Sequence, residues 1–195
     1  MQQMVKNRRP FKGKWFLVFA LFVGGQSFLL QLADSIISSY IIGGDNLGYV
    51  FIAFQGWALY FLLGSRTEAI VKGICGYGAG IAFSVIMIAV SRQFQPIGRF
   101  AVPLTALLVV PVMMYFEFAP RWINNVAIFF VGSGAFYGIY TYGGGMTISR
   151  AAGIVLLYCG LGLCSGWTTI WFRRRYEQWL KGGSNEQLTE TDQSK

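Results

Sequence analysis

The sequence predicts an all-α integral membrane protein with six transmembrane helices. Six uncharged, mostly apolar runs cover most of the chain, and each approaches the roughly 20 residues that a helix needs to cross a bilayer. Hydrophobic residues make up 54% of the chain and charged residues only 12%, whereas about 25% is usual in soluble domains. No run shows the strict alternation of a β-barrel, so we expect helices. The predicted spans are Trp15–Ala33, Leu47–Gly64, Gly73–Ser91, Phe100–Phe116, Ile123–Tyr142 and Ala151–Phe172.

Charged residues stand beside these runs and set their limits. In chain order they are Lys14 and Asp34, Arg66, Lys72 and Arg92, Arg99 and Glu117, Arg121, and Arg150 and Arg173. We divide the chain into a basic cytoplasmic arm, residues 1–14, a transmembrane domain, residues 15–173, and a polar cytoplasmic tail, residues 174–195. The end of the tail is poor in apolar residues, so we expect the tail to be largely disordered.

The net charge of +8 fits the expected topology of the spans. Basic residues gather before the first span and after the last, and the positive-inside rule puts both ends in the cytoplasm. Cytoplasmic ends require an even number of spans, which agrees with six. We therefore expect the lipid bilayer, and not nucleic acid, as the partner of these residues. They are Lys6, Arg8, Arg9, Lys12 and Lys14 at the start and Arg173, Arg174, Arg175 and Lys181 at the end.

Residue types that catalysis and metal binding usually need are scarce. The chain has no histidine, which excludes histidine proton relays and most zinc, copper and haem sites. Its cysteines, Cys75, Cys159 and Cys164, all fall inside predicted spans and are typical of small buried hydrophobic residues. No Ser/His/Asp triad, Walker loop or metal-spacing motif is present. We expect a protein that is not an enzyme and uses no cofactor or metal.

The two halves of the chain share a pattern. In the second and fifth spans, small residues precede an aromatic pair, Tyr60–Phe61 and Phe136–Tyr137. A glycine-containing turn with one or two basic residues follows in each half, and then a glycine-rich span. Three-span halves must have opposite orientations, and such inverted repeats are common in transporters and channels. Two glycine-rich hydrophobic halves can also resemble each other by composition alone, so both interpretations remain open.

The second span also carries a pattern known from other proteins. It reads F-x-G-W-A-x-Y-F from Phe54 to Phe61 and is followed by a tight loop, while the fifth span runs into glycine-rich residues and glycines punctuate the last. In these features the chain resembles the bacterial inner-membrane proteins known as domain of unknown function 1097, from about Trp15 to Phe172. The resemblance implies a small six-span protein of the inner (plasma) membrane and no settled activity. The termini of this chain are longer than is usual there.

Glycine pairs spaced by four residues occur in three of the predicted spans. This spacing puts both glycines on one helix face and lets two helix backbones approach closely. The faces can pack within one subunit or between subunits, and they can also widen a pore. Because one subunit cannot bury every such face, we expect a homo-oligomer. The pairs are Gly76 and Gly80, Gly134 and Gly138, and Gly162 and Gly166.

Polar and aromatic residues in the spans predict a path for a solute. Aromatic walls can hold a small solute while amide and hydroxyl groups replace its water. The alternative is that the aromatic side chains face lipid and the hydroxyl groups bond across helices. If the halves are inverted repeats, we expect the residues of the second and fifth spans to meet near the midplane. The predicted path residues are Gln26, Gln55, Trp57, Tyr60, Ser133, Phe136, Tyr137 and Tyr140.

Two carboxylates lie next to spans and are candidates for a charge gate or for ion coupling. Asp34 follows the first span, but it would lie inside the membrane if that helix ran on to about Ile42. Glu117 ends the fourth span, where it can pair with Arg121 one turn later or stand at a pore mouth.

We expect a membrane channel or facilitator for a small polar solute, such as urea, an amide or a related nitrogenous compound. One alternative is a scaffold or accessory subunit that does not transport. A second alternative is an ion-coupled secondary transporter in which Asp34 or Glu117 is the coupling carboxylate.

Overall fold

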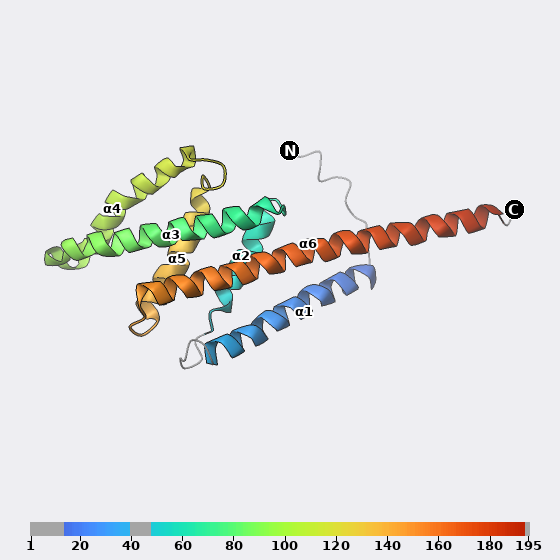
Figure 1. Cartoon of the computed structure of the whole chain (residues 1–195), viewed down its shortest axis with the longest axis horizontal. Coiled ribbons are helices and arrows are strands. Elements are labelled where there is room, and N and C mark those ends of the chain that lie inside the picture. The colour runs from blue at the N-terminus through green and yellow to red at the C-terminus, as the bar shows by residue number, and fades with distance from the viewer. Residues whose placement is uncertain (1–13, 40–47, 194–195) are drawn as a thin grey trace.

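The computed structural model describes the backbone of residues 14–39 and 48–193 and the side chains of residues 16–39 and 48–180. Within these ranges the chain is all-helical, without a strand (Figure 1). Two short 3-10 helices, η3 and η4, flank α4. The elements are α1 (Lys14–Ile37), α2 (Val50–Leu62), α3 (Glu68–Gln93), η3 (Gln95–Phe100), α4 (Ala101–Met114), η4 (Tyr115–Phe118), α5 (Val126–Tyr142) and α6 (Ile148–Gln193).

Each predicted span coincides with one of these helical segments, in the same order. In the described part of the chain, 4 helical segments are long and apolar enough to cross a membrane: Phe16–Ile37, Glu68–Gln93, Gln95–Phe118 and Ile148–Leu180. Helices α2 and α5 are apolar too, but shorter. Large apolar side chains such as Leu21, Leu62 and Phe118 point outward, as they do in lipid. The protein is therefore a multi-pass helical membrane protein.

Two helices continue past the ends that the sequence suggested. Helix α1 does not stop at Ala33 but runs to Ile37, which puts Asp34 inside the helix. Helix α6 passes Phe172 and remains helical to Gln193, through the segment where we expected a largely disordered tail. Residues with high helix propensity, such as Glu177, Gln178 and Leu180, favour this continuation of the helix. The basic arm, residues 1–13, lies outside the described residues, and the three-part division of the chain remains a prediction.

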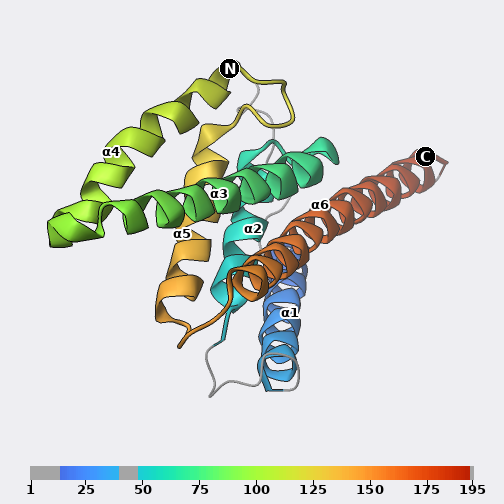
Figure 2. The ribbon, with the colours of Figure 1, turned by 60° about the vertical axis from the view of Figure 1, so that its left-hand side comes forward.

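The helices pack in an interlocked arrangement. Helix α2 packs mainly on α6, α3 packs mainly on α5, and α3 also contacts α6 (Figure 2). Helix α4 lies against α3, where Phe83, Val109, Met113, Val126 and Phe129 form a small separate core. Helix α1 covers part of α6 and runs antiparallel to it (Figure 1).

Helices α2 and α6 approach each other backbone to backbone. A Cβ atom at Gly56 would lie 2.8 Å from the carbonyl oxygen of Cys159 and 3.4 Å from the Cα atom of Gly162. In return, a Cβ atom at Gly162 would overlap the carbonyl oxygen of Ala53 and would lie 2.8 Å from the amide nitrogen of Trp57. Only glycine fits at these two positions, because the obstacle in each case is backbone that cannot turn aside.

Helices α3 and α5 make the same kind of contact. A Cβ atom at Gly132 would lie 2.7 Å from the Cα atom of Tyr77 and 3.0 Å from its carbonyl oxygen. A Cβ atom at Gly80 would overlap the carbonyl oxygen of Phe129 and would lie 2.7 Å from the amide nitrogen of Ser133. The two contacts have the same register. Each glycine faces the residue three positions before the glycine of the partner helix, as Gly56 faces Cys159, three residues before Gly162.

The links between the paired helices match as well. Residues 63–67 join α2 to α3, and residues 143–147 join α5 to α6. Both links turn through residues with positive φ, Gly64 and Ser65 in the first and Gly144 and Gly145 in the second. The second and third helices thus correspond to the fifth and sixth in the order of elements, in link length and in their closest contacts.

Candidate functional site

A buried carboxylate lies near the end of α1. Asp34 is only 5% exposed, and the side chains one turn before and after it, Leu30 and Ser38, are buried as well. These residues repeat every four positions, so they form one face of the helix. The other side chains from residue 16 to residue 37 are exposed or half-buried. The helix therefore buries one narrow face, with Asp34 on it.

Three groups donate hydrogen bonds to one oxygen of this carboxylate. Oδ1 of Asp34 accepts from the hydroxyl of Tyr158 at 2.5 Å, from the backbone N–H of Tyr49 at 3.0 Å and from the hydroxyl of Ser38 at 3.3 Å. The ring of Tyr49 meets the ring of Tyr158 edge-on, with centroids 6.1 Å apart. A Cβ atom at Gly48 would collide with Oδ2 of Asp34, so glycine leaves room for this carboxylate. Asp34 thus ties α1, the segment before α2, and α6 together.

Asp34 forms no ion pair with any residue that the structure describes. The ion pair within the described residues joins Arg173 to Glu177. A carboxylate inside a membrane helix is costly, and in helical membrane proteins such residues commonly mark ion paths or proton relays. The arrangement offers a buried oxygen ligand held by neutral donors, which can bind a proton or a small cation without breaking an ion pair.

A second polar contact joins the same two helices farther along. The side-chain amide of Gln26 donates to the carbonyl oxygen of Ser165 at 3.3 Å and contacts the hydroxyl of Thr168. Its carbonyl oxygen accepts from the hydroxyl of Thr169 at 2.7 Å. Gln26 therefore faces protein, and its hydrogen-bonding capacity is used between helices.

The other predicted path residues lie at separate helix contacts. Gln55 is exposed on the outside of α2, whereas Trp57 and Tyr60 are buried. Ser133 contacts the hydroxyl of Ser84 at 2.6 Å, between α5 and α3. We expected Gln55 and Ser133 to meet near a midplane. The structure does not bring them together, because the rotation of α2 turns Gln55 outward.

The aromatic residues of α5 pack in two ways. The ring of Phe136 is fully buried and stacks on that of Tyr140, with centroids 5.8 Å apart and an interplanar angle of 6°. Tyr137 and Tyr140 are half-buried, and the hydroxyl of Tyr140 lies 3.5 Å from Arg92. A solute path through these side chains remains a prediction.

Two buried polar atoms have no hydrogen-bond partner among the described residues. They are Nε1 of Trp57, on α2, and the hydroxyl of Tyr77, on α3. Such groups usually find a partner when buried, so an unpaired donor in a membrane protein is a candidate for contact with a solute or water. Trp57 was among the predicted path residues. Tyr77 was not, because one tyrosine in an apolar run gives no signal of its depth.

Glu117 is exposed in η4. The chain leaves the helix at Ala119, whose ψ of 171° is extended. Glu117 and Arg121 are therefore not one turn apart on a helix, and no ion pair joins them within the described residues. Of the two interpretations of Glu117, pairing with Arg121 is therefore not found. A charge gate at Glu117 remains a prediction.

The predicted glycine faces divide into two kinds. In α3 and α6 the glycines touch neighbouring helices: Gly76 would meet Ile128 and Gly166 would meet the ring of Tyr60, while Gly80 and Gly162 make the backbone contacts described above. A Cβ atom at Gly134 or Gly138 would meet nothing within 4 Å. Packing inside the subunit therefore uses the faces of α3 and α6, and the face of α5 is open.

Comparison with known proteins gives one family. The family model described as "Protein of unknown function (DUF1097)" matches residues 35–174, which include Asp34's partners Ser38, Tyr49 and Tyr158. No curated protein and no solved structure matches the chain.

Proposed function

The chain belongs to the DUF1097 family of proteins of unknown function, and we propose that it is a six-span membrane channel or facilitator for a small polar solute. The solute class that we propose is urea, an amide or a related nitrogenous compound. We place the protein in the inner (plasma) membrane with both termini in the cytoplasm. Transport, and not catalysis, is the proposed activity.

One observation carries the proposal: the contact between α2 and α6 is repeated between α5 and α3. Gly56 on α2 corresponds to Gly132 on α5, and Gly162 on α6 corresponds to Gly80 on α3. Each of these glycines lies against the backbone of the residue three positions before the glycine of the partner helix. In two three-helix repeats, the second helix corresponds to the fifth and the third helix to the sixth. A contact between α2 and α6 would therefore recur between α5 and α3 if the two repeats interlock. Inverted repeats of this kind are a common plan of membrane transport proteins, with the solute site where the repeats meet.

The polar groups near the repeat contact support an uncharged solute. Ser84 and Ser133 contact each other across α3 and α5, and Trp57 and Tyr77 carry unpaired donors on α2 and α3. These groups are neutral, so they can replace the water of a urea-like molecule without binding an ion tightly. The open face at Gly134 and Gly138 supports a homo-oligomer, since small residues favour close helix association in lipid.

The proposal is tested with the purified full chain in liposomes. A channel gives solute flux down a solute gradient alone, measured by light scattering as the liposomes swell, across a panel of urea, formamide and acetamide. Ser133→Ala should lower this flux several-fold, whereas the matched exposed control Ser149→Ala should leave it unchanged. A folded protein that carries no member of the panel would favour a scaffold and contradict the proposal.

The buried carboxylate favours a second candidate, an ion-coupled transporter. Asp34 accepts three hydrogen bonds from neutral donors and has no cationic neighbour among the described residues. Coupling would appear in the same liposomes as solute accumulation driven by a proton or sodium gradient. Asp34→Asn should then abolish accumulation but retain exchange, and a flux indifferent to both gradients would exclude this candidate.

A further inference from the structure

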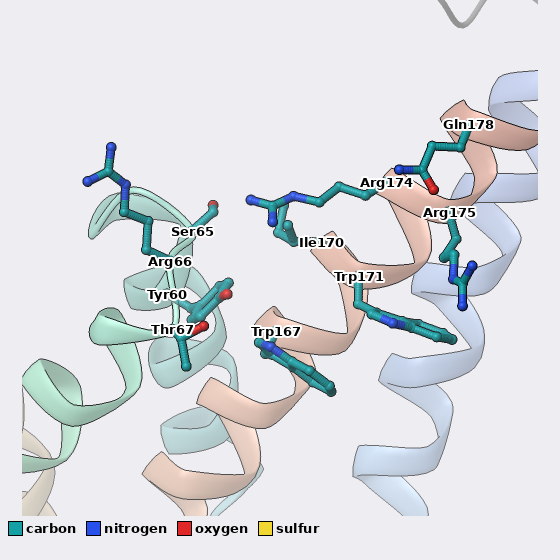
Figure 3. A pocket seen from close by; sticks show the side chains of 10 residues that line it. All are labelled: Tyr60, Ser65, Arg66, Thr67, Trp167, Ile170, Trp171, Arg174, Arg175 and Gln178. Atoms are coloured by element: carbon teal, nitrogen blue, oxygen red, sulfur yellow. The ribbon is translucent and has the colours of Figure 1, made fainter. Parts of the chain in front are cut away.

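A basic pocket lies where the apolar part of α6 ends. It has a volume of about 420 Å³ and is enclosed by the link between α2 and α3 on one side and by α6 on the other (Figure 3). From the link come Ser65, Arg66 and Thr67, and from α6 come two tryptophans and two arginines, Trp167, Trp171, Arg174 and Arg175. The lining of the pocket is therefore both aromatic and basic.

The charge of this pocket is of one sign. Arg66, Arg174 and Arg175 form no ion pair with a carboxylate within the described residues, and the pocket has no acidic lining residue. Arg174 extends from α6 toward the link, where the hydroxyl of Ser65 lies (Figure 3). Unneutralised arginines around a hollow create a site for an anion, and guanidinium groups match phosphate oxygens well.

The link is held in shape by its own backbone. Ser65 has a φ of 57°, a left-handed conformation that is strained for a residue other than glycine. Its amide donates to the carbonyl oxygen of Tyr60 at 3.1 Å, and that of Gly64 donates to Phe61 at 3.1 Å. This turn places Ser65 and Thr67 in the lining of the pocket.

An apolar pocket adjoins the basic one. It has a volume of about 430 Å³ and lies between α1, the end of α2, and α6. Phe19, Val23 and Phe61 line it, and it shares Ser65 and Ile170 with the basic pocket. The two hollows thus adjoin at Ser65 and Ile170. The second is lined mainly by aliphatic and aromatic side chains, and Thr169 and Arg173 complete its lining.

We propose that these two pockets together bind one anionic phospholipid, with the phosphate among the arginines and an acyl chain along Phe19, Val23 and Phe61. The level of the pocket agrees, because exposed Trp167 and Trp171 are the residues expected at the boundary between hydrocarbon and headgroups. Basic pockets between membrane helices are suited to anionic headgroups. A soluble phosphate ester would use the arginines alone and would leave the apolar pocket without a ligand.

The test uses the purified full chain in mild detergent and native mass spectrometry, with phosphatidylglycerol, phosphatidylcholine and glycerol 3-phosphate as probes. The wild-type protein should retain phosphatidylglycerol about thirtyfold better than phosphatidylcholine, as expected for two basic contacts of about 1 kcal/mol each. Glycerol 3-phosphate at the same concentration should not displace it. If glycerol 3-phosphate binds as well as phosphatidylglycerol, the site takes soluble phosphate and the lipid proposal is wrong.

Two variants locate the site. Arg66→Gln with Arg174→Gln should reduce the preference for phosphatidylglycerol at least fivefold, whereas Arg92→Gln with Arg99→Gln, which removes equal charge elsewhere, should not. Thr67→Asp adds a carboxylate at the residue before α3, a position where aspartate is well tolerated. It should weaken binding about fivefold, while Thr147→Asp, before α6, should leave it unchanged. Equal lipid retention by Thr67→Asp and Thr147→Asp would overturn the proposal.

Discussion

Asp34 gains its importance from neighbours that are remote in the sequence. In the chain it is one carboxylate at the edge of an apolar run. In the structure it is 5% exposed and accepts a hydrogen bond from Tyr158, 124 residues away. The free energy of such a bond depends on whether its partner can find another donor when the bond is lost. A buried carboxylate cannot turn to water, so each donor around Asp34 should contribute measurably to stability.

Replacing Tyr158 with phenylalanine tests this at the level of one atom. The change removes the hydroxyl that donates to Asp34 at 2.5 Å and keeps the buried ring. We expect the free energy of unfolding to fall by about 0.5–2 kcal/mol, the range for single hydrogen bonds between membrane helices. Reversible unfolding in mixed micelles measures it. Tyr115→Phe, at an exposed tyrosine, is the control, and equal stability of both variants would contradict the role of this bond.

Helix pairs α2–α6 and α3–α5 are held by glycines whose neighbours are backbone atoms. Side chains can rotate away from an added methyl group, but the carbonyl groups of Ala53 and Phe129 belong to helices and cannot. The open glycines of the same helices, Gly78 on α3 and Gly160 on α6, have nothing within 4 Å. Each helix therefore contains its own control position, two residues from the closed one.

Alanine substitutions separate these positions. Gly80→Ala and Gly162→Ala should each lower the free energy of unfolding by about 1–3 kcal/mol, because the added Cβ atom forces the helices apart. Gly78→Ala and Gly160→Ala should be neutral or slightly stabilising, since alanine favours the helix. The four variants are compared by thermal unfolding in one detergent. A large difference between Gly80→Ala and Gly162→Ala would argue against equivalent halves.

The whole molecule consists of apolar helices with exposed apolar surface. Lipid or other protein must therefore cover that surface. The outward faces suit lipid, while the open face of α5 at Gly134 and Gly138 lets another helix approach closely. In the six-span arrangement that we propose, the antiparallel α1 and α6 put the start of α1 and the end of α6 on one side. Because basic clusters stand before α1 and at Arg173, Arg174 and Arg175, we expect that side to be the cytoplasm.

Topology is tested by reporter fusions at Asn7 and Lys195. Both should report the cytoplasm, because the segments beside them carry the basic clusters. A fusion at Gly98, between α3 and α4, should report the opposite side and serves as the internal control. A periplasmic signal at one terminus alone would mean an odd number of spans and would remove the basis for inverted halves.

Assembly is tested by the double substitution of Gly134 and Gly138 with leucine. A Cβ atom at either position has nothing within 4 Å inside the subunit, so the fold should persist while a close helix contact between subunits is lost. Light scattering in detergent should then give a smaller particle than the wild-type protein. The control replaces Ala82 and Ala89, exposed on α3, with leucine. An unchanged particle size would mean that the open face of α5 contacts lipid.

Class, family and helix order follow from local features of the chain. The bilayer imposes a length and an apolar composition on each span, and both can be counted along the sequence, so every predicted run coincides with a helix. The family resemblance is confirmed by the match over residues 35–174. The pattern shared by Gly56–Phe61 and Gly132–Tyr137 was visible too, because it rests on residue order alone.

Rotation and partnership of the helices needed the tertiary structure. An apolar helix has no polar stripe to show which face is buried. Gln55 therefore turned outward although we predicted it in a solute path, and only the structure showed that Gly134 is open within the subunit. The partners of Asp34 and the joining of Arg66 with Arg174 in one pocket depend on contacts between distant segments. Hydrophobic run length is a property of neighbours in the chain, whereas a site is a property of neighbours in space.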